Sequence, residues 1–292
     1  MTNWSTVFSI SLIQNMFMAT IIACVLCGVI GTYVVINRSV SATGGIAHTT
    51  FGGVGFAYYM ESVFFVSWFT PMMGALLFGI IAALIIALSN VSNTIRQDSM
   101  IGALWAVGMA LGVIFLCFTN RSVVTPHSYE SILFGNVMFV SSNTLITMGI
   151  LAIIIVAIVI YLYRDLQILT FDSIHARLSG IDVTLLNIVL YVMIAVACVM
   201  VSNVVGIVMI IALMTIPAAM ANLYTHNLKE MMIFGTILSI VLSILGLLMA
   251  IALDCPPGAT VVLVIGVAFT IVMLGRKFHR THVTSRNEEI SE

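Results

Sequence analysis

The sequence predicts an all-α integral membrane protein with about nine transmembrane helices. Of its 292 residues, 61% are hydrophobic and only 7% are charged, whereas a soluble domain carries roughly a quarter charged residues. A chain of this composition has too few polar side chains to cover its surface in water. Its apolar segments are long and lack strict alternation, which favours helices over the strands of a membrane barrel.

The predicted spans are apolar runs of about 20 residues, the length that a helix needs to cross roughly 30 Å of hydrocarbon. They cover 12–36, 43–60, 63–88, 99–118, 143–163, 183–202, 204–225, 230–252 and 259–275. The polar pair Ser202-Asn203 is expected to form the hairpin inside the long apolar stretch 183–225. We therefore expect a membrane domain over 1–275 and a polar cytosolic tail over 276–292.

The basic residues predict the orientation, because Lys and Arg gather on the cytosolic side of a membrane protein. With the N-terminus outside and the C-terminus in the cytosol, only Arg121 of the ten basic residues falls outside. The inside set is Arg38, Arg96, Arg164, Arg177, Lys229, Arg276, Lys277, Arg280 and Arg286. The opposite orientation reverses this distribution, so we expect the N-terminus outside.

The second span contains a histidine among glycines, in the stretch SATGGIAHTTFGGVGF. On a helix, His48 shares a face with Gly44, Phe51, Gly52 and Gly55. Glycines at this spacing allow a second helix backbone to approach closely. The imidazole could therefore bond a carbonyl across a tight helix contact. Ionisable residues inside membranes also mark ion or substrate pathways, and we favour that interpretation.

Pro217 lies in the middle of the predicted span 204–225 and is expected to bend it, because proline removes a backbone donor. Thr215, Ala219, Asn222 and His226 follow at helical spacing and predict a polar stripe toward the cytosolic end. This span is either a hinge with no ligand contact or a mobile wall of a pathway.

The segment 164–182, RDLQILTFDSIHARLSGID, carries the densest charge of the membrane domain. Asp172 is suited to cap a helix start and Gly180 to follow a helix end. Ile174 and Leu178 then share one face of a short amphipathic helix outside the bilayer. The segment is either a solvated loop or a docking element for a cytosolic partner.

The stretch LDCPPGATVV, residues 253–262, predicts a turn on the outer side that Pro256-Pro257-Gly258 stiffens. For Asp254, a capping or turn role is favoured over metal capture.

Several classes of function lack their motifs in this sequence. A Walker A loop is absent, so the chain does not itself hold ATP phosphates. Nothing in the sequence combines basic and aromatic residues as a nucleic-acid-binding surface does. No nucleophile or paired-carboxylate arrangement indicates hydrolysis, and we expect a transport protein without an enzymatic site.

Five motifs, in one order along the chain, resemble a known family. They are Arg38 followed by TGGIAHTTFGG, Leu133-Phe134-Gly135, the set Asp172, Ala176 and Gly180, the segment VGIVMIIALMTIPAAMA, and Asp254-Cys255-Pro256-Pro257-Gly258. Together they resemble the permease subunits of ATP-binding-cassette (ABC) importers for divalent metals, of the zinc and manganese type.

The resemblance implies a type II ABC importer-like permease in the inner (cytoplasmic) membrane. It implies a homodimer with the ion path at the dimer axis and no permanently bound cofactor. A separate ATPase subunit would use ATP, and an extracytoplasmic metal-binding protein would dock on the outer face, where Asp254 lies. The coupling helix on the ATPase subunit would include Asp172, Ile174, Ala176, Arg177, Leu178 and Gly180.

The family has an aspartate one turn before the histidine, and this chain has Gly44 there. Within the family both residues are thought to contact the metal. A carboxylate is a hard, anionic ligand, so its loss leaves His48 as a neutral site that leans toward zinc over manganese. Asn222 and His226 are candidates to replace the aspartate.

Three other functions remain open from the residues. The first is an ABC permease for a metal chelate such as a siderophore or cobalamin, and the second is an ion-coupled secondary transporter. The third is a membrane scaffold in which the glycines, His48 and Pro217 serve packing alone.

Overall fold

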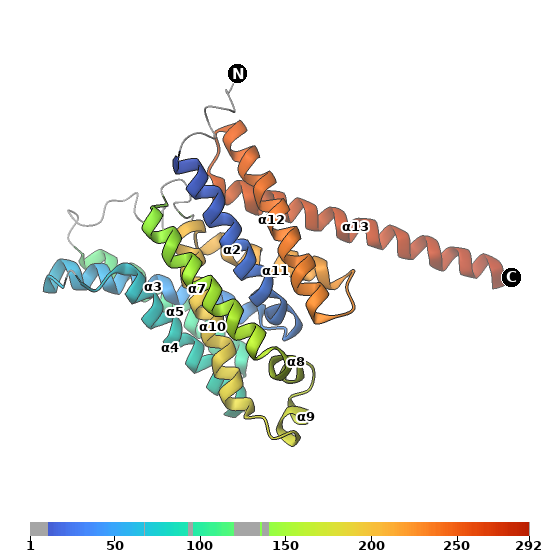
Figure 1. The fold of residues 1–292 in the computed structure, drawn as a ribbon, viewed down its shortest axis with the longest axis horizontal. Coiled ribbons are helices and arrows are strands. Elements are labelled where there is room, and N and C mark those ends of the chain that lie inside the picture. The colour runs from blue at the N-terminus through green and yellow to red at the C-terminus, as the bar shows by residue number, and fades with distance from the viewer. Residues whose placement is uncertain (1–10, 67, 93–95, 120–134, 136–139, 292) are drawn as a thin grey trace.

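The computed structural model describes residues 11–66, 68–92, 96–119, 135 and 140–291, and these residues form helices joined by short connections (Figure 1). The helices are α2 (Ser11–Ile36), α3 (Val40–Phe64), α4 (Pro71–Ser92), α5 (Gln97–Phe118), α7 (Ser142–Tyr161), α8 (Tyr163–Phe171), α9 (Ser173–Leu178), α10 (Val183–Val205), α11 (Ile207–Asn222), α12 (Leu228–Leu253) and α13 (Pro257–Ser291). The predicted all-helical class is confirmed. Arg121, Leu133 and Phe134, used above, lie outside the described residues.

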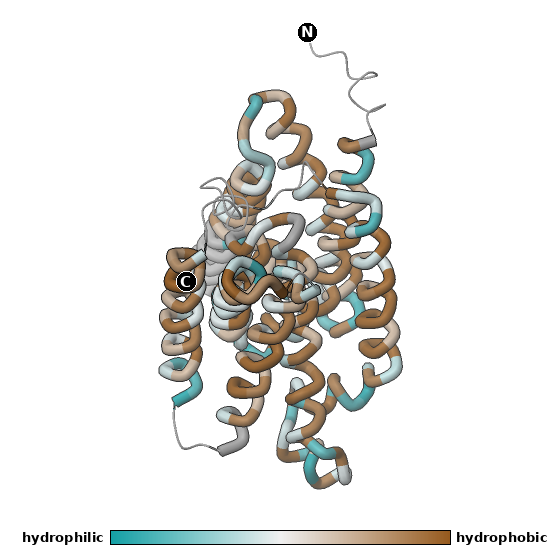
Figure 2. The backbone as a smooth tube through the Cα atoms, turned by 90° about the vertical axis from the view of Figure 1, so that its left-hand side faces the viewer, coloured by the Kyte–Doolittle hydropathy of each residue, from teal (hydrophilic) through white to brown (hydrophobic). Residues whose placement is uncertain are grey.

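Seven helices of the described chain are long and apolar enough to cross a membrane: α2, α4, α5, α7, α10, α12 and α13. The other two predicted spans fall on α3 and α11. Glycine, threonine and His48 dilute the apolar character of α3, and α11 has only 16 residues. Most of the chain is hydrophobic along its helices (Figure 2).

The predicted span 63–88 was wrong at its start. The helix α3 runs to Phe64, and Phe65 follows in the left-handed conformation with φ 55°. The next helix begins at Pro71, where a fixed φ suits the first helical position. Aromatic residues such as Trp68 make this connection as apolar as a transmembrane span. The apolar pattern of the sequence therefore does not mark where α3 ends and α4 begins.

The hairpin predicted at Ser202-Asn203 was also wrong, because both residues lie within α10. The chain breaks instead at Gly206, whose φ of 87° is readily available only to glycine. Gly135, with φ 78°, packs against the same break. A Cβ added to Gly135 would overlap the backbone of Val205. The helix that follows is therefore Ile207–Asn222, shorter than the predicted span 204–225.

The predicted boundary at residue 276 does not coincide with a break in the backbone. The helix α13 continues through the polar tail to Ser291 and extends far from the other helices (Figure 1).

The helices α3, α4 and α5 pack through glycine. An added Cβ on Gly52 would lie 2.7 Å from the Gly108 carbonyl oxygen, and one on Gly55 would lie 2.6 Å from that of Gly112. On another side of α3, a Cβ on Gly53 would overlap the Gly74 carbonyl oxygen of α4. The predicted close helix approach is confirmed, and it fixes α3 rigidly against two neighbours.

A second group of helices surrounds α2, which contacts α7, α10, α11 and α12. Residues of α2 such as Cys24, Ile30 and Tyr33 are fully buried in the main core. The Cys24 thiol donates a hydrogen bond to Ser243 Oγ of α12 at 3.3 Å. The histidine helix α3 is thus supported by a well-packed helical scaffold.

Candidate functional site

His48 lies on the tightly packed helix α3 and faces α5. Its imidazole stacks on the Trp105 indole, with ring centroids 4.4 Å apart and planes inclined by 17°. The ring is half-buried, and Nδ1 is buried without a hydrogen-bond partner among the residues that the structure describes. The packing alternative, in which the imidazole bonds to a carbonyl across the helix contact, is therefore not seen at Nδ1.

Gly44, where the resemblance leads us to expect an aspartate, lies beside the same indole. An added Cβ there would lie 3.0 Å from Trp105 Cζ3, so any side chain at this position would pack tightly against the indole. Among the described residues, no cluster of three or more His, Cys, Asp or Glu side chains could hold a metal ion. An ion that meets His48 would therefore have few protein ligands beside it.

Thr49, next to His48, forms a side-chain hydrogen bond that links α3 to α5. Its Oγ1 lies 2.7 Å from the Gly45 carbonyl oxygen and 3.1 Å from the Leu104 carbonyl oxygen of α5. Reasoning from the sequence missed both Trp105 and Thr49. The only signal for Trp105 was a lone tryptophan inside an apolar span.

The predicted stripe on α11 is only partly present. Pro217 lies within the helix and is buried, and the Thr215 hydroxyl donates to the Ile211 carbonyl at 2.6 Å. Asn222 is the exposed last residue of the helix, and His226 lies beyond it in the turn before α12. His226 therefore does not continue the helical stripe as predicted.

The start of α11 lies close to the His48 region of α3. Ile207 packs in one buried cluster with Ala47 and Phe51, which flank His48 in the sequence. The residue after the break at Gly206 thus packs against Ala47 and Phe51 of α3, whereas Asn222 lies at the opposite end of α11.

The segment 164–182 forms two short helices, α8 and α9. The Asp172 carboxylate accepts hydrogen bonds from the backbone N–H groups of Ile174 and His175, both at 2.9 Å, and so caps α9. Gly180 follows the helix with φ 79°. The predicted cap, stop and short helix are confirmed.

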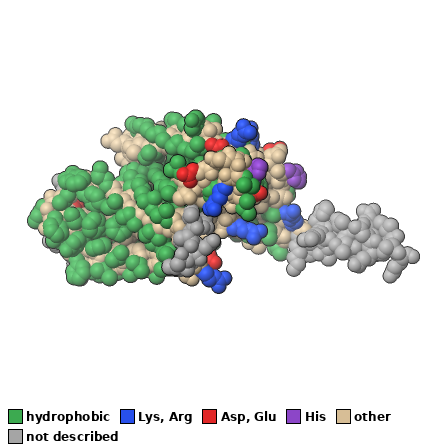
Figure 3. Space-filling model, turned by 90° about the horizontal axis from the view of Figure 1, so that it is seen from below, with side chains coloured by type: hydrophobic (Ala, Val, Ile, Leu, Met, Phe, Trp, Pro, Cys, Tyr) green, Lys and Arg blue, Asp and Glu red, His purple; other side chains and the backbone are tan. Residues whose placement is uncertain are grey.

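Two large apolar side chains of α9 are exposed among polar ones. Ala176 is fully buried, whereas Ile174 and Leu178 are 72% and 82% exposed. Arg177 is exposed beside them in the last turn. Viewed from the end that carries α8 and α9, charged side chains gather on one part of the surface and apolar ones cover the rest (Figure 3).

Asp254 ends α12 in the left-handed conformation, with φ 53°. Its side chain is exposed, and α13 begins three residues later at Pro257. The predicted turn role is confirmed.

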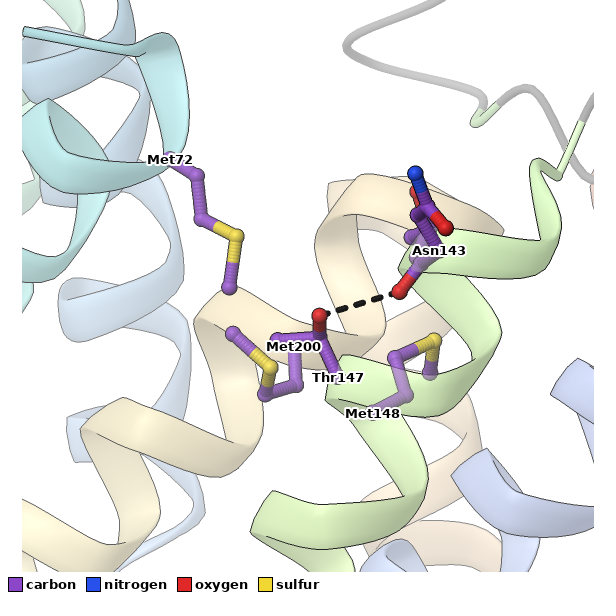
Figure 4. A pocket seen from close by; sticks show the side chains of 6 residues that line it. Met72, Asn143, Thr147, Met148 and Met200 are labelled. Carbon is purple, nitrogen blue, oxygen red and sulfur yellow. Dashed lines mark hydrogen bonds between the residues drawn. The ribbon is translucent and has the colours of Figure 1, made fainter. Parts of the chain in front are cut away.

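A cavity of about 180 Å³ lies between α4, α7 and α10 (Figure 4). Its lining residues are Met72, Asn143, Thr144, Thr147, Met148 and Met200. The Thr147 hydroxyl is engaged with the Asn143 carbonyl at 2.9 Å. Sequence reasoning did not group these methionines, because they come from three separate helices.

Known proteins resemble this chain over most of its length. The sequence profile of the ABC 3 transport family matches residues 9–276. A manganese transport system membrane protein of Listeria monocytogenes is 32% identical, covering 90% of this chain and 90% of the relative. A probable metal transport system membrane protein of Chlamydia pneumoniae is 31% identical, covering 92% and 91%.

A solved structure agrees with these relatives. A chain of PsaBC from Streptococcus pneumoniae, in complex with a Fab, has a TM-score of 0.78 and 25% identity. The match covers 90% of this chain and 91% of that chain. The helical architecture and these matches agree, and the chain belongs to the ABC 3 transport family of ABC transporter permeases.

Proposed function

We propose that this chain is the membrane-spanning permease subunit of an ABC importer for divalent transition-metal ions. The observation that carries the proposal is His48, an imidazole with an unpartnered Nδ1 inside the glycine-packed helix α3. Ionisable groups in a membrane domain mark ion pathways. The relatives named for metal and manganese transport support the same class of cargo.

The proposal includes nine membrane-crossing helices, with α3 and α11 added to the seven apolar ones. The distribution of Lys and Arg supports an outer N-terminus and a cytosolic C-terminus. The segment α8–α9 then lies in the cytosol, and the Asp254 turn faces the side from which a metal-binding protein delivers its ion. We place the protein in the cytoplasmic membrane as a homodimer, with the ion path between the two copies.

A separate ATPase subunit supplies the energy in this proposal. The exposed side chains of Ile174 and Leu178 offer that subunit an apolar contact, and the Asp172 cap keeps α9 folded to present it. Movement of α9 reaches the membrane through α10, which follows it directly. The Gly206 break and Pro217 allow α11 to shift beside His48.

Two arguments on the metal point in different directions. A neutral imidazole without a carboxylate favours zinc over manganese. The relatives named for manganese transport support manganese. A site with few ligands suits both, because a transported ion must also leave.

The test is the metal content of cells grown under metal limitation. Cells that lack this chain should lose zinc or manganese selectively, and the native chain should restore that metal. His48→Ala should restore little, whereas Gly102→Ala, at a position open to solvent or lipid, should restore it fully. Unchanged contents of zinc, manganese and iron in cells without the chain would refute the proposed function.

A further inference from the structure

We infer that Trp105 is the positioning residue of His48, holding the imidazole by ring stacking where most histidine sites use a hydrogen bond. The inference rests on the proposed function, because it assigns a role within the same ion pathway. Nothing in the sequence motifs pointed to Trp105.

The first observation is that His48 lacks the usual anchor. A metal-ligating histidine almost always donates its second ring N–H to a carboxylate, a carbonyl or water, which fixes the ring orientation. His48 Nδ1 is buried and has no hydrogen-bond partner among the described protein residues. The nearly parallel indole at 4.4 Å is the contact that restrains the ring.

The second observation is that glycines at the contact between α3 and α5 let the two helices approach closely enough for the two rings to stack. An added Cβ on Gly44 would lie 3.0 Å from Trp105 Cζ3, so a side chain at that position would crowd the indole that stacks on the imidazole. On the opposite helix, a Cβ on Gly108 would lie 2.6 Å from Thr49 Cα. The two rings are therefore held by two rigid helices at short range.

The stack also has an electrostatic consequence. An imidazole that binds a cation becomes more positive, and the indole face is negative, so the two attract as in a cation–π pair. Trp105 would thus stabilise the ion-bound form of His48 without a carboxylate. Because the indole carries no net charge, it would also not trap the ion.

The uptake test compares substitutions that keep or remove the aromatic face. Trp105→Leu should raise the KM for the metal about tenfold, the range seen when outer-shell partners of metal ligands are lost. Trp105→Phe should stay close to the native value. The double variant with His48→Ala should be no worse than His48→Ala alone, because coupled residues are not additive.

Trp68 offers a matched control, since it is 72% exposed in the connection between α3 and α4. Trp68→Leu should leave KM unchanged. A native KM in Trp105→Leu would overturn the inference, as would additive losses in the double variant.

A second measurement detects the contact without transport. The chain has three tryptophans, so Trp4→Phe with Trp68→Phe leaves Trp105 as the sole indole in the full-length transporter. Co²⁺, which quenches nearby indoles, should quench its fluorescence saturably, and His48→Ala should abolish this. A chain that keeps only Trp68 should show no saturable quenching. Quenching of Trp105 that persists in His48→Ala would overturn the inference.

The two measurements separate the two proposals. If native cells import metal and Trp105→Leu imports it with an unchanged KM, the positioning role fails alone. If the native chain imports no metal but Co²⁺ still quenches Trp105 through His48, the ion site is supported and the import function fails.

Discussion

At His48, the imidazole has an aromatic ring on one face and no acidic residue one turn before it. A Cβ added to Gly44 would lie 3.0 Å from Trp105 Cζ3, so a side chain at this position would need the indole to shift by a few tenths of an ångström. A neutral ligand binds a divalent ion less tightly than an anionic one. For a permease this favours release, because conduction requires sites that the ion can leave.

The same chemistry predicts that acid inhibits uptake. Only a neutral imidazole binds a metal, so protons compete with the ion for His48. The neighbouring helices α4 and α11 contain no charged residue, and α3 and α5 contain only Glu61 and Asp98. We expect uptake to fall as the pH drops from about 7.5 to about 5.5, measured with radiolabelled metal in proteoliposomes.

The control for this experiment is the delivery step. The binding protein must be shown to remain loaded at the lower pH, and the residual uptake of His48→Ala should be flat across the range. Equal native uptake at both pH values would contradict the role of His48 as a ligand.

At the scale of single elements, the packing of α3 against its neighbours depends on glycines, which have no side chain to keep the helices apart. Gly52, Gly53 and Gly55 meet backbone atoms of α4 and α5 at distances that no Cβ allows. We therefore expect Gly53→Ala, which would overlap the Gly74 carbonyl, to cost about 1–3 kcal/mol of stability. The measurement is the thermal midpoint of the purified chain in detergent.

Gly102→Ala is the matched control, because an added Cβ there meets nothing within 4 Å. It should leave the midpoint unchanged or raise it slightly, since alanine favours helix. Equal midpoints for the two variants would show that α3 and α4 can separate without cost.

Helices whose ends are determined by capping residues close in the sequence could be predicted. The helix α9 was found because Asp172 caps it and Gly180 ends it within nine residues of chain. The start of α4 was missed because Phe65 and Trp68 are as apolar as the helices they connect. The contact between His48 and Trp105 was missed because it joins two helices, and apolar patterns do not encode which faces meet.

For the whole molecule, the cysteines provide a test of orientation. Cys255 is exposed in the turn between α12 and α13, whereas Cys24, Cys27 and Cys198 are buried. In a Cys117→Ala background, we expect an impermeant maleimide to label Cys255 in right-side-out vesicles. This follows from the outer position of the α12–α13 turn when the N-terminus is outside.

A reporter on the opposite side completes the test. A cysteine introduced by Ser179→Cys, just after α9, should react only in inverted vesicles. Labelling of Cys255 only in inverted vesicles, with residue 179 accessible from outside, would reverse the proposed topology.

The short helix α11 bears on how membrane voltage acts on the cargo. Its 16 residues span about 24 Å, less than the roughly 30 Å of hydrocarbon in a bilayer. In the proposed topology, in which α11 crosses the membrane, the transmembrane potential would fall over a shorter distance along α11 than along a full-length span. Each elementary charge gains about 2.3 kcal/mol per 100 mV across the full field. A divalent ion moving along α11 would cross most of the transmembrane potential in a single movement. An imposed membrane voltage should therefore change the rate of import.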